Sequence, residues 1–330
     1  RAWQELQSLH IVDHQNKLTQ HGQQVAQLPC HPRFAHMLLQ AKAHSEKAAI
    51  LGCILTALLE ERDIFSGEKA RFDSNINHRV EHLVNHWQKP FGAIAAIIKQ
   101  VKSLLKSLHI NVQHALTSLS CLPTQMSGLL LAYAYPERIA KARKLSGEYI
   151  SANGKGVTIS EQDALANESF LVIADLMQVN RTLRVRLAAS VDLKPLTEAF
   201  ESDIVTEEQA IIDDSNGKII ARQQTKLSAL ILTEKVSDTP LTDEVISKMW
   251  ASTVAKKGLS VLPWQAKDIA LKARWQWLND YFPQFALPHI TEQALLASLS
   301  QWFTPFVGKI KSKAKLAKLD SMSFSSINEL

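Results

Sequence analysis

The spacing of apolar residues changes twice along the 330 residues, and this change constrains the fold more than any single motif. Up to about residue 134, apolar side chains recur three and four positions apart, as they do between Ile50 and Leu59, which is the period of a helix packed on one face. Residues 147–236 instead contain short segments rich in β-branched residues, and helical spacing returns after Pro240. The pattern predicts an α+β, multidomain chain: a helical bundle, a small antiparallel β-barrel and a carboxy-terminal, mainly helical domain.

Two Asn-Gly pairs mark turns in the predicted barrel. Asn153–Gly154 and Asn216–Gly217 each separate two segments of strand character, and a primed hairpin turn needs positive φ at both central positions. We expect a barrel of five to seven strands that ends near Val236 and is interrupted by a short helix near 194–200. The predicted strands are 147–152, 155–159, 170–179, 182–190, 203–213 and 218–226.

The bulk composition is that of an ordinary globular protein, with 46% apolar and 21% charged residues. No apolar run approaches the roughly 18 residues of a membrane span, and no targeting segment is visible, so we expect a cytoplasmic protein. The three cysteines, Cys30, Cys53 and Cys121, are an odd number without a C-x-x-C pair. They argue against a disulfide framework and against a zinc knuckle.

Charge is distributed unevenly, although the net charge is only +5. Residues 309–318 contain five lysines and no acid, whereas residues 198–214 contain seven acids and no lysine or arginine. Such an asymmetry can orient a polyanion along one surface. Two solvated faces are the simpler explanation from charge alone.

One histidine-rich motif suggests a metal site. His78, Glu81 and His82 give the order H-x-x-E-H found in a class of zinc peptidases, and His86 adds a third imidazole one turn later. On a helix counted from Ile76, however, the imidazoles lie away from the apolar face. The spacing therefore favours histidines that face solvent, and we expect no bound metal.

One glycine-rich stretch suggests a phosphate-binding loop. Residues 147–156 read GEYISANGKG, but six residues separate Gly147 from the Gly-Lys pair where a P-loop has four, and Gly156 follows Lys155 where a P-loop has Ser or Thr. The stretch therefore predicts a hairpin. Because G-x-x-x-x-G-K-[ST], D-E-x-H and G-x-S-x-G do not occur in these residues, we expect no catalytic residue, no cofactor and no ATP hydrolysis from them.

Cationic residues gather on the segments that form the predicted barrel and lead into it. Guanidinium and ammonium groups can engage successive phosphates, and barrel faces are recurrent platforms for single strands. A solvated outer face explains the same pattern about as well. Because Tyr149 is the only obvious aromatic residue for base stacking on these strands, we expect any nucleic acid to be bound mainly through its sugar-phosphate backbone. The candidate RNA-binding residues are Arg138, Arg143, Lys155, Arg184 and Arg186.

Eight stretches spread over nearly the whole chain form a recognisable series. They are LTQHGQQVAQLPCHPRFAHMLLQA (18–41), ALLEERD (57–63), AYPERIAKAR (134–143), YISANGKGV (149–157), LVIADL (171–176), LRVRLAAS (183–190), GLSVLPW (258–264) and QWFTPFVG (301–308). In this order they resemble the carboxy-terminal half of the bacterial HrpB family of DEAH-type ATP-dependent RNA helicases. The chain departs from the family pattern at Lys155 and Val157, and in the lysine-rich residues 309–318.

The resemblance implies an order of domains. It implies the end of a winged-helix domain in residues 1–30, a helical ratchet-like domain in 31–130, an OB-like β-barrel domain in 131–236 and a truncated, family-specific helical domain in 237–330. In this family two RecA-like motor domains come first and carry the ATP-binding, DEAH and arginine-finger motifs. ATP and Mg²⁺ would therefore bind in those domains and not in these residues.

The resemblance also implies a role in holding RNA. The ratchet and barrel domains would form one side of a channel for single-stranded RNA, or DNA, against the RecA-like domains of the same chain. The five barrel cations named above would line it. Arg33 and Arg62 lie in matched ratchet motifs and are expected to line the channel or to serve in packing and salt bridges. The alternative is a protein-interaction scaffold, in which the aromatic carboxy-terminal domain docks a protein partner without direct RNA contact.

Overall fold

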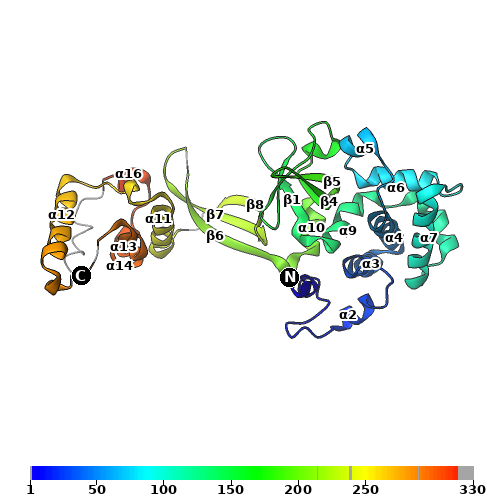
Figure 1. Ribbon diagram of the computed structural model, residues 1–330, viewed down its shortest axis with the longest axis horizontal. Coiled ribbons are helices and arrows are strands. Elements are labelled where there is room, and N and C mark those ends of the chain that lie inside the picture. The colour runs from blue at the N-terminus through cyan, green and yellow to red at the C-terminus, as the bar shows by residue number, and fades with distance from the viewer. Residues whose placement is uncertain (1, 214, 238–239, 289, 319–330) are drawn as a thin grey trace. The chain divides into compact units, whose positions relative to one another are not determined.

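A computed structural model describes residues 2–213, 215–237, 240–288 and 290–318 (Figure 1). The described chain belongs to the α+β class, as predicted, with helices, a closed barrel and a further sheet. It divides into two compact units, of which the first contains Arg1–Ile204 with Lys226–Leu232 and the second contains Val205–Thr225 with Thr233–Leu330. None of the described helices has the length and apolarity needed to cross a membrane.

The first unit begins with two short helices and continues as a helical bundle. Local signals fix where the helices start: Pro32 occupies the first helical position of one, and the Ser45 hydroxyl accepts the Ala48 N–H at the start of the next. The helices are α1 (Ala2–Ser8), α2 (Gln20–Val25), α3 (Pro32–His44), α4 (Glu46–Glu60), α5 (Gly67–Phe72), α6 (Ile76–Asn85), α7 (Gly92–Ser107), α8 (Val112–Ser118) and α9 (Ser127–Ala134).

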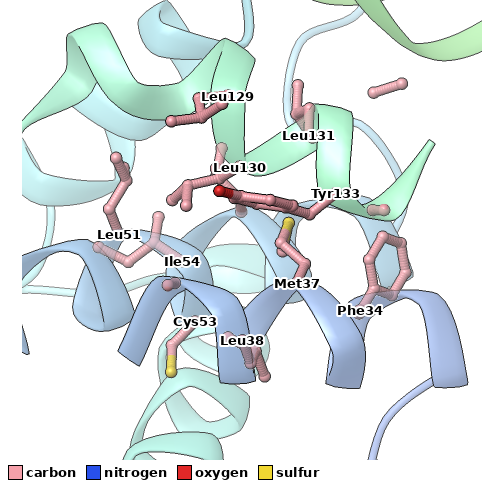
Figure 2. Packing of buried hydrophobic residues seen from close by; sticks show 14 of the residues in the cluster. Phe34, Met37, Leu38, Leu51, Cys53, Ile54, Leu129, Leu130, Leu131 and Tyr133 are labelled. Atoms are coloured by element: carbon pink, nitrogen blue, oxygen red, sulfur yellow. The ribbon is translucent and has the colours of Figure 1, made fainter. Parts of the chain in front are cut away.

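The core of this bundle is built around α4 and α9. Every residue from 48 to 58 of α4 is buried, and so is every residue of α9. A helix that is apolar all round is stable only where neighbours surround it. Figure 2 shows Leu51 and Ile54 of α4 beside Leu130 of α9, with Met37 of α3 in the same layer. Helix α9 also packs against the barrel, so the bundle and the barrel share this core.

Five strands close into the barrel in the order β1-β2-β3-β5-β4. All neighbouring strands are antiparallel except β3 and β5, which run parallel with Val157 opposite Leu183. The prediction of a wholly antiparallel barrel is wrong at this pair, because the chain order does not reveal which distant strands meet. The strands are β1 (Ile139–Ala142), β2 (Glu148–Ser151), β3 (Gly156–Thr158), β4 (Phe170–Val179) and β5 (Thr182–Ser190).

The strands that follow the short helix α10 (Leu193–Ala199) do not join the barrel. They are β6 (Ile204–Ile212), β7 (Ile219–Leu227) and β8 (Leu230–Ser237), and they form a separate sheet in the order β6-β7-β8. The prediction that the barrel extends to about Val236 is therefore wrong. These strands pair with one another instead of with barrel strands, and nothing in their local sequence distinguishes them from barrel strands.

Both Asn-Gly pairs lie in hairpin loops, but the turns are not primed ones. Gly154 and Gly217 have φ of +78° and +66°, whereas neither Asn153 nor Asn216 has positive φ. The two asparagines act through their side chains. Asn153 Oδ1 accepts the Lys155 N–H at 3.1 Å, and Asn216 Oδ1 accepts the N–H two residues later at 2.8 Å.

The second unit has a helical core around two tryptophans. Trp250 and Trp302 are buried, and their indole N–H groups donate to the carbonyls of Ile310 and Leu295, each at 2.8 Å. The helical segment after Thr291 is divided at Ser298. The helices are α11 (Asp243–Lys257), α12 (Ala266–Tyr281), α13 (Glu292–Ala297), α14 (Leu299–Trp302), α15 (Thr304–Val307) and α16 (Lys313–Leu316).

A buried carboxylate joins the helical bundle to the barrel. Asp163 is 3% exposed, and its two oxygens accept the N–H groups of Ser74 at 2.7 Å and of Leu165 at 3.0 Å. The Ser74 carbonyl accepts the Ala188 N–H at 2.8 Å, so the segment before α6 is hydrogen-bonded to strand β5. This junction holds one side of the barrel against the bundle.

A histidine pair joins α2 to α3, with His36 buried and His21 half-buried. His21 Nε2 and His36 Nδ1 are 2.7 Å apart, and His36 is 7% exposed. Burial, followed by the nearby His21 and His10 rings, lowers the pKa of His36 to about 3. His36 is therefore neutral in the folded chain over the whole physiological range of pH.

Asp163→Ala should destabilise the first unit by about 2–4 kcal/mol, because two buried N–H donors lose their acceptor. Urea unfolding followed by circular dichroism measures this change. Glu161→Ala, two residues away and exposed, is the matched control and should change stability by less than about 0.5 kcal/mol. Equal effects of the two substitutions would contradict the structural role of Asp163.

The stability of the first unit should fall as the pH drops below about 6.5, because His36 binds a proton in the unfolded chain at pH values where it stays neutral in the folded chain. The depressed pKa predicts a loss of about 2 kcal/mol between pH 7.5 and pH 5 from this group. Urea unfolding at both pH values should show that loss in the parent and in the exposed-site control His14→Gln, but not in His36→Gln. An identical pH dependence in all three proteins would refute the assignment.

Candidate nucleic-acid interface at the barrel mouth

One end of the barrel opens into a pocket whose wall comes from three separate parts of the first unit. Its floor is apolar and consists of barrel side chains that also belong to, or pack against, the barrel core: Val157, Ile173, Leu176 and Leu183. Its rim is polar and comes from α1, from the start of α3, from residues 137–138 and from the β2–β3 hairpin. We call this hollow the barrel-mouth pocket.

Arg33, at the start of α3, connects three segments at the rim. Its guanidinium donates to the Ala134 carbonyl at 2.8 Å and to the Glu137 carboxylate at 3.0 Å, and it pairs with Glu5 of α1 at 3.3 Å. The Arg33 side chain is only 12% exposed. Burial alone would lower its pKa, but the two carboxylates outweigh that effect and raise it. Arg33 therefore serves as a salt-bridge residue that shapes the rim, which is one of the two roles expected for it.

Arg138 is held in place from two sides. Its Nη1 donates to the Ala174 carbonyl of β4 at 2.8 Å, and its guanidinium carbon lies 4.5 Å from the centre of the Tyr135 ring. The Arg33 guanidinium also lies over this ring, at 5.3 Å. Tyr135 thus orients both arginines. Sequence reasoning missed Tyr135, which lies within a matched stretch but carries no signal of its own.

Lys155 lies on the exposed tip of the β2–β3 hairpin. Its backbone is fixed on both sides, because its carbonyl accepts the Ser151 N–H at 3.0 Å and its N–H donates to Asn153 Oδ1 at 3.1 Å. The Ser151 hydroxyl donates to the same carbonyl at 2.8 Å. The hairpin therefore presents the Lys155 side chain at the rim with little backbone freedom.

The rim has a modest excess of positive charge. Three cations, Arg33, Arg138 and Lys155, line it together with two carboxylates, Glu5 and Glu137. The carboxylates offset Arg33 most directly, since the Arg138–Glu137 distance is 3.8 Å. Arg138 and Lys155 are consequently the two groups best placed to attract an anionic ligand.

The other candidate cations lie elsewhere. Arg143 is exposed in the β1–β2 loop, and Arg62 is exposed in the loop after α4. Arg184 and Arg186 lie on β5, where Arg184 is paired in register with Met177 and Arg186 forms an ion pair with Asp175 at 3.4 Å. The barrel-mouth pocket is lined by none of these four. The structure therefore brings Arg138 and Lys155 together with Arg33, and leaves the remaining candidates outside this pocket.

The expectation that Tyr149 offers a stacking surface is wrong. Its side chain is fully buried in the barrel core, and its hydroxyl donates to the carbonyls of Leu165 at 2.7 Å and Glu168 at 2.8 Å. Burial raises the pKa of Tyr149 to about 12. Alternation along a strand does not reveal which of its two faces a closed barrel encloses.

The expected solvent exposure of the histidine motif is correct for His78 only. His78 is exposed and lies 2.9 Å from Asp73. His82 and His86 are half-buried with ring centres 4.3 Å apart, and they continue a row of rings that includes Phe65 and Phe91. Within the described ranges, no group of three or more His, Cys, Asp or Glu side chains is placed to hold a metal ion.

Two comparisons, with curated proteins and with solved structures, find relatives of this chain. No protein-family model matches the chain. The ATP-dependent RNA helicase HrpB of Escherichia coli (strain K12) is 28% identical over 306 residues, which cover 92% of this chain and 35% of that protein. The chain thus spans about a third of the length of the curated relative it matches.

Two solved structures give the same result. The crystal structure of the E. coli DExH-box NTPase HrpB matches with a TM-score of 0.56 and 25% identity, covering 99% of this chain and 37% of that one. A second crystal structure, of the E. coli DEAH/RHA helicase HrpB, matches at 24% identity with the same TM-score and covers 99% of this chain and 38% of that one, and it supports the fold alone. The chain is therefore homologous to E. coli HrpB over most of its own length.

Proposed function

We propose that these residues are the RNA-binding part of an ATP-dependent RNA helicase, and that the barrel-mouth pocket contacts the phosphate backbone of single-stranded RNA. The observation that carries the proposal is that Arg138 and Lys155 line the same rim as Arg33 and its two carboxylate partners (the Arg33 cluster), at the open end of a barrel. The chain that forms this rim is homologous to HrpB. Guanidinium and ammonium groups bind phosphates through charge-assisted hydrogen bonds.

The barrel topology supports this proposal. Five-stranded barrels of the OB type bind oligonucleotides on their strand faces and connecting loops. The pocket takes its floor from β3, β4 and β5 and part of its rim from the β2–β3 hairpin. The helical bundle that adjoins this barrel is the element that we assign to the ratchet-like domain.

The pocket is better suited to binding the sugar-phosphate backbone of RNA than to recognising a specific base sequence. Arg138 is oriented before any ligand arrives, because Ala174 and Tyr135 already hold its guanidinium. The apolar floor offers a surface against which a ribose or a base can pack. Glu5 and Glu137 repel phosphates from the Arg33 side of the rim, which directs the strand toward Arg138 and Lys155.

In this proposal ATP and Mg²⁺ bind to the RecA-like domains that the family resemblance implies. Hydrolysis there would move RNA past the barrel, and the residues described here would hold the strand between steps. The intact helicase would act in the cytoplasm.

The scaffold alternative is favoured by one observation in the second unit. Several aromatic side chains of α12 and the turn after it are exposed, including Trp277 at 52%, Tyr281 at 67% and Phe285 at 60%. Exposed aromatic groups of this kind are frequent in protein interfaces. RNA binding that falls steeply with salt favours the helicase proposal, whereas absent or salt-independent binding favours the scaffold.

Lys155→Ala should weaken the binding of fluorescein-labelled oligouridylate several-fold. It should also make the slope of log K against log salt less negative by about 0.7 to 1, because one phosphate contact is lost. Fluorescence anisotropy at several salt concentrations measures both quantities. Lys89→Ala, an exposed lysine in the α6–α7 loop, is the matched control and should leave both unchanged. A Lys155→Ala protein indistinguishable from Lys89→Ala would argue against the pocket.

The double substitution Arg184→Ala/Arg186→Ala should weaken the same RNA less than Arg138→Ala/Lys155→Ala does. The first pair lies outside the pocket and Arg186 is already paired with Asp175, whereas the second pair forms part of the rim. Anisotropy titrations at one salt concentration compare the two proteins, with thermal melting to show that both are folded. The reverse order of effects would place the RNA path on the outer face of β5.

A further inference from the structure

A groove in the second unit runs between strand β6 and helix α11. Five consecutive residues of β6, 208–212, line it together with one face of α11. Successive side chains of a strand point to opposite faces of the sheet. A groove that contacts five residues in a row must therefore follow the edge of the strand, where the backbone groups point. We call it the β6–α11 groove.

Among the described strands, none pairs with the outer edge of β6. The order β6-β7-β8 makes β6 an edge strand. The Asp213 N–H donates toward β7, to the Lys218 carbonyl at 2.8 Å. Alternation along an antiparallel strand then turns the N–H groups of Ile212 and Ala210 away from β7. An edge with such outward groups is a template for a further strand.

The core of the second unit fixes which face α11 turns to the groove. Trp250 and Val254 are buried in that core on one side of the helix. Val245, Met249 and Thr253, spaced one turn apart, line the groove from another side. The middle of the groove is therefore mainly apolar.

The groove is strongly basic around this apolar middle. Four lysines line it, namely Lys248, Lys256, Lys257 and Lys313, with Glu208 as the one acidic residue among the described lining residues. Lys248 also pairs with Glu244 at 2.7 Å. Lys313 belongs to the lysine-rich residues 309–318, and its N–H donates to the Gly217 carbonyl at 2.9 Å. The β6–β7 hairpin thus holds part of the lysine-rich segment at the groove.

We propose that the β6–α11 groove binds an extended peptide with acidic side chains, which adds to the sheet as a new strand along β6. The open edge supplies backbone hydrogen bonds, Val245 and Met249 accept alternate apolar side chains, and the lysines pair with the acidic ones. A polynucleotide fits less well, because no aromatic side chain is among the described lining residues to stack a base. This proposal does not rest on RNA binding at the barrel mouth.

The test uses the whole chain and a fluorescein-labelled octapeptide of alternating Glu and Val. Fluorescence anisotropy should show saturable binding, and a peptide of alternating Lys and Val should bind at least tenfold more weakly. Ala210→Pro should weaken binding at least tenfold, because it removes one outward N–H while an edge strand tolerates proline there. Lys256→Glu/Lys257→Glu should weaken it to a similar extent.

Lys235→Glu, an exposed lysine of β8 outside the groove, is the matched control and should leave peptide binding unchanged. Thermal melting shows that each variant is folded, and the RNA affinity of Ala210→Pro should equal that of the parent. The proposal is overturned if the Glu-Val peptide does not bind saturably, or if Ala210→Pro binds it as the parent does. It is also overturned if oligouridylate displaces the peptide and loses affinity through the same lysine substitutions, since the groove would then be a nucleic-acid site.

Discussion

The guanidinium of Arg33 is the contact on which the barrel mouth depends. It links α1, the end of α9 and the start of the barrel through Glu5, Ala134 and Glu137, and the last of these lies 104 residues away in sequence. Because the group is largely buried, water screens these bonds little, and the loss of Arg33 would leave carboxylates without their cation. The same guanidinium lies over Tyr135, which also orients Arg138. One buried cation therefore sets the position of its exposed neighbour.

A second contact fixes the barrel against the helical bundle. Asp163 and Ser74 join the barrel to the segment before α6, at a place different from the Arg33 cluster. A barrel attached to the bundle at two places has little freedom to rotate against it. In the proposed function this rigidity matters, because RNA that is bound between motor steps must be held by groups that do not move with it.

Much of the fold follows from the period of the apolar residues. The run of Ile and Leu in α4 predicts a central helix, and every residue from 48 to 58 is buried. The end of the barrel could not be predicted in this way, because β6 to β8 have the same local character as barrel strands and differ only in which distant strands they pair with. The burial of Tyr149 could not be predicted for the same reason. Alternation along the strand assigns Tyr149 to one of two faces, but only the closure of the barrel makes that face the interior.

Less of the candidate site could be predicted. Arg138 and Lys155 come from stretches that resemble HrpB helicases, and the structure brings both to one rim. Their meeting with Arg33 and Tyr135 depends on contacts between residues far apart in sequence, which no local pattern encodes. Arg184 and Arg186 lie on a strand, as predicted, yet they are outside the pocket, because the inward and outward faces of β5 are set by its pairing with β3 and β4.

The most direct test of the central claim is to map where single-stranded RNA contacts the chain. Oligouridylate that carries 4-thiouridine can be cross-linked by near-ultraviolet light, and the modified peptides identified by mass spectrometry. The barrel-mouth account predicts cross-links in residues 133–138 and 151–157. Cross-links confined to the helical bundle or to residues 240–318 would contradict it.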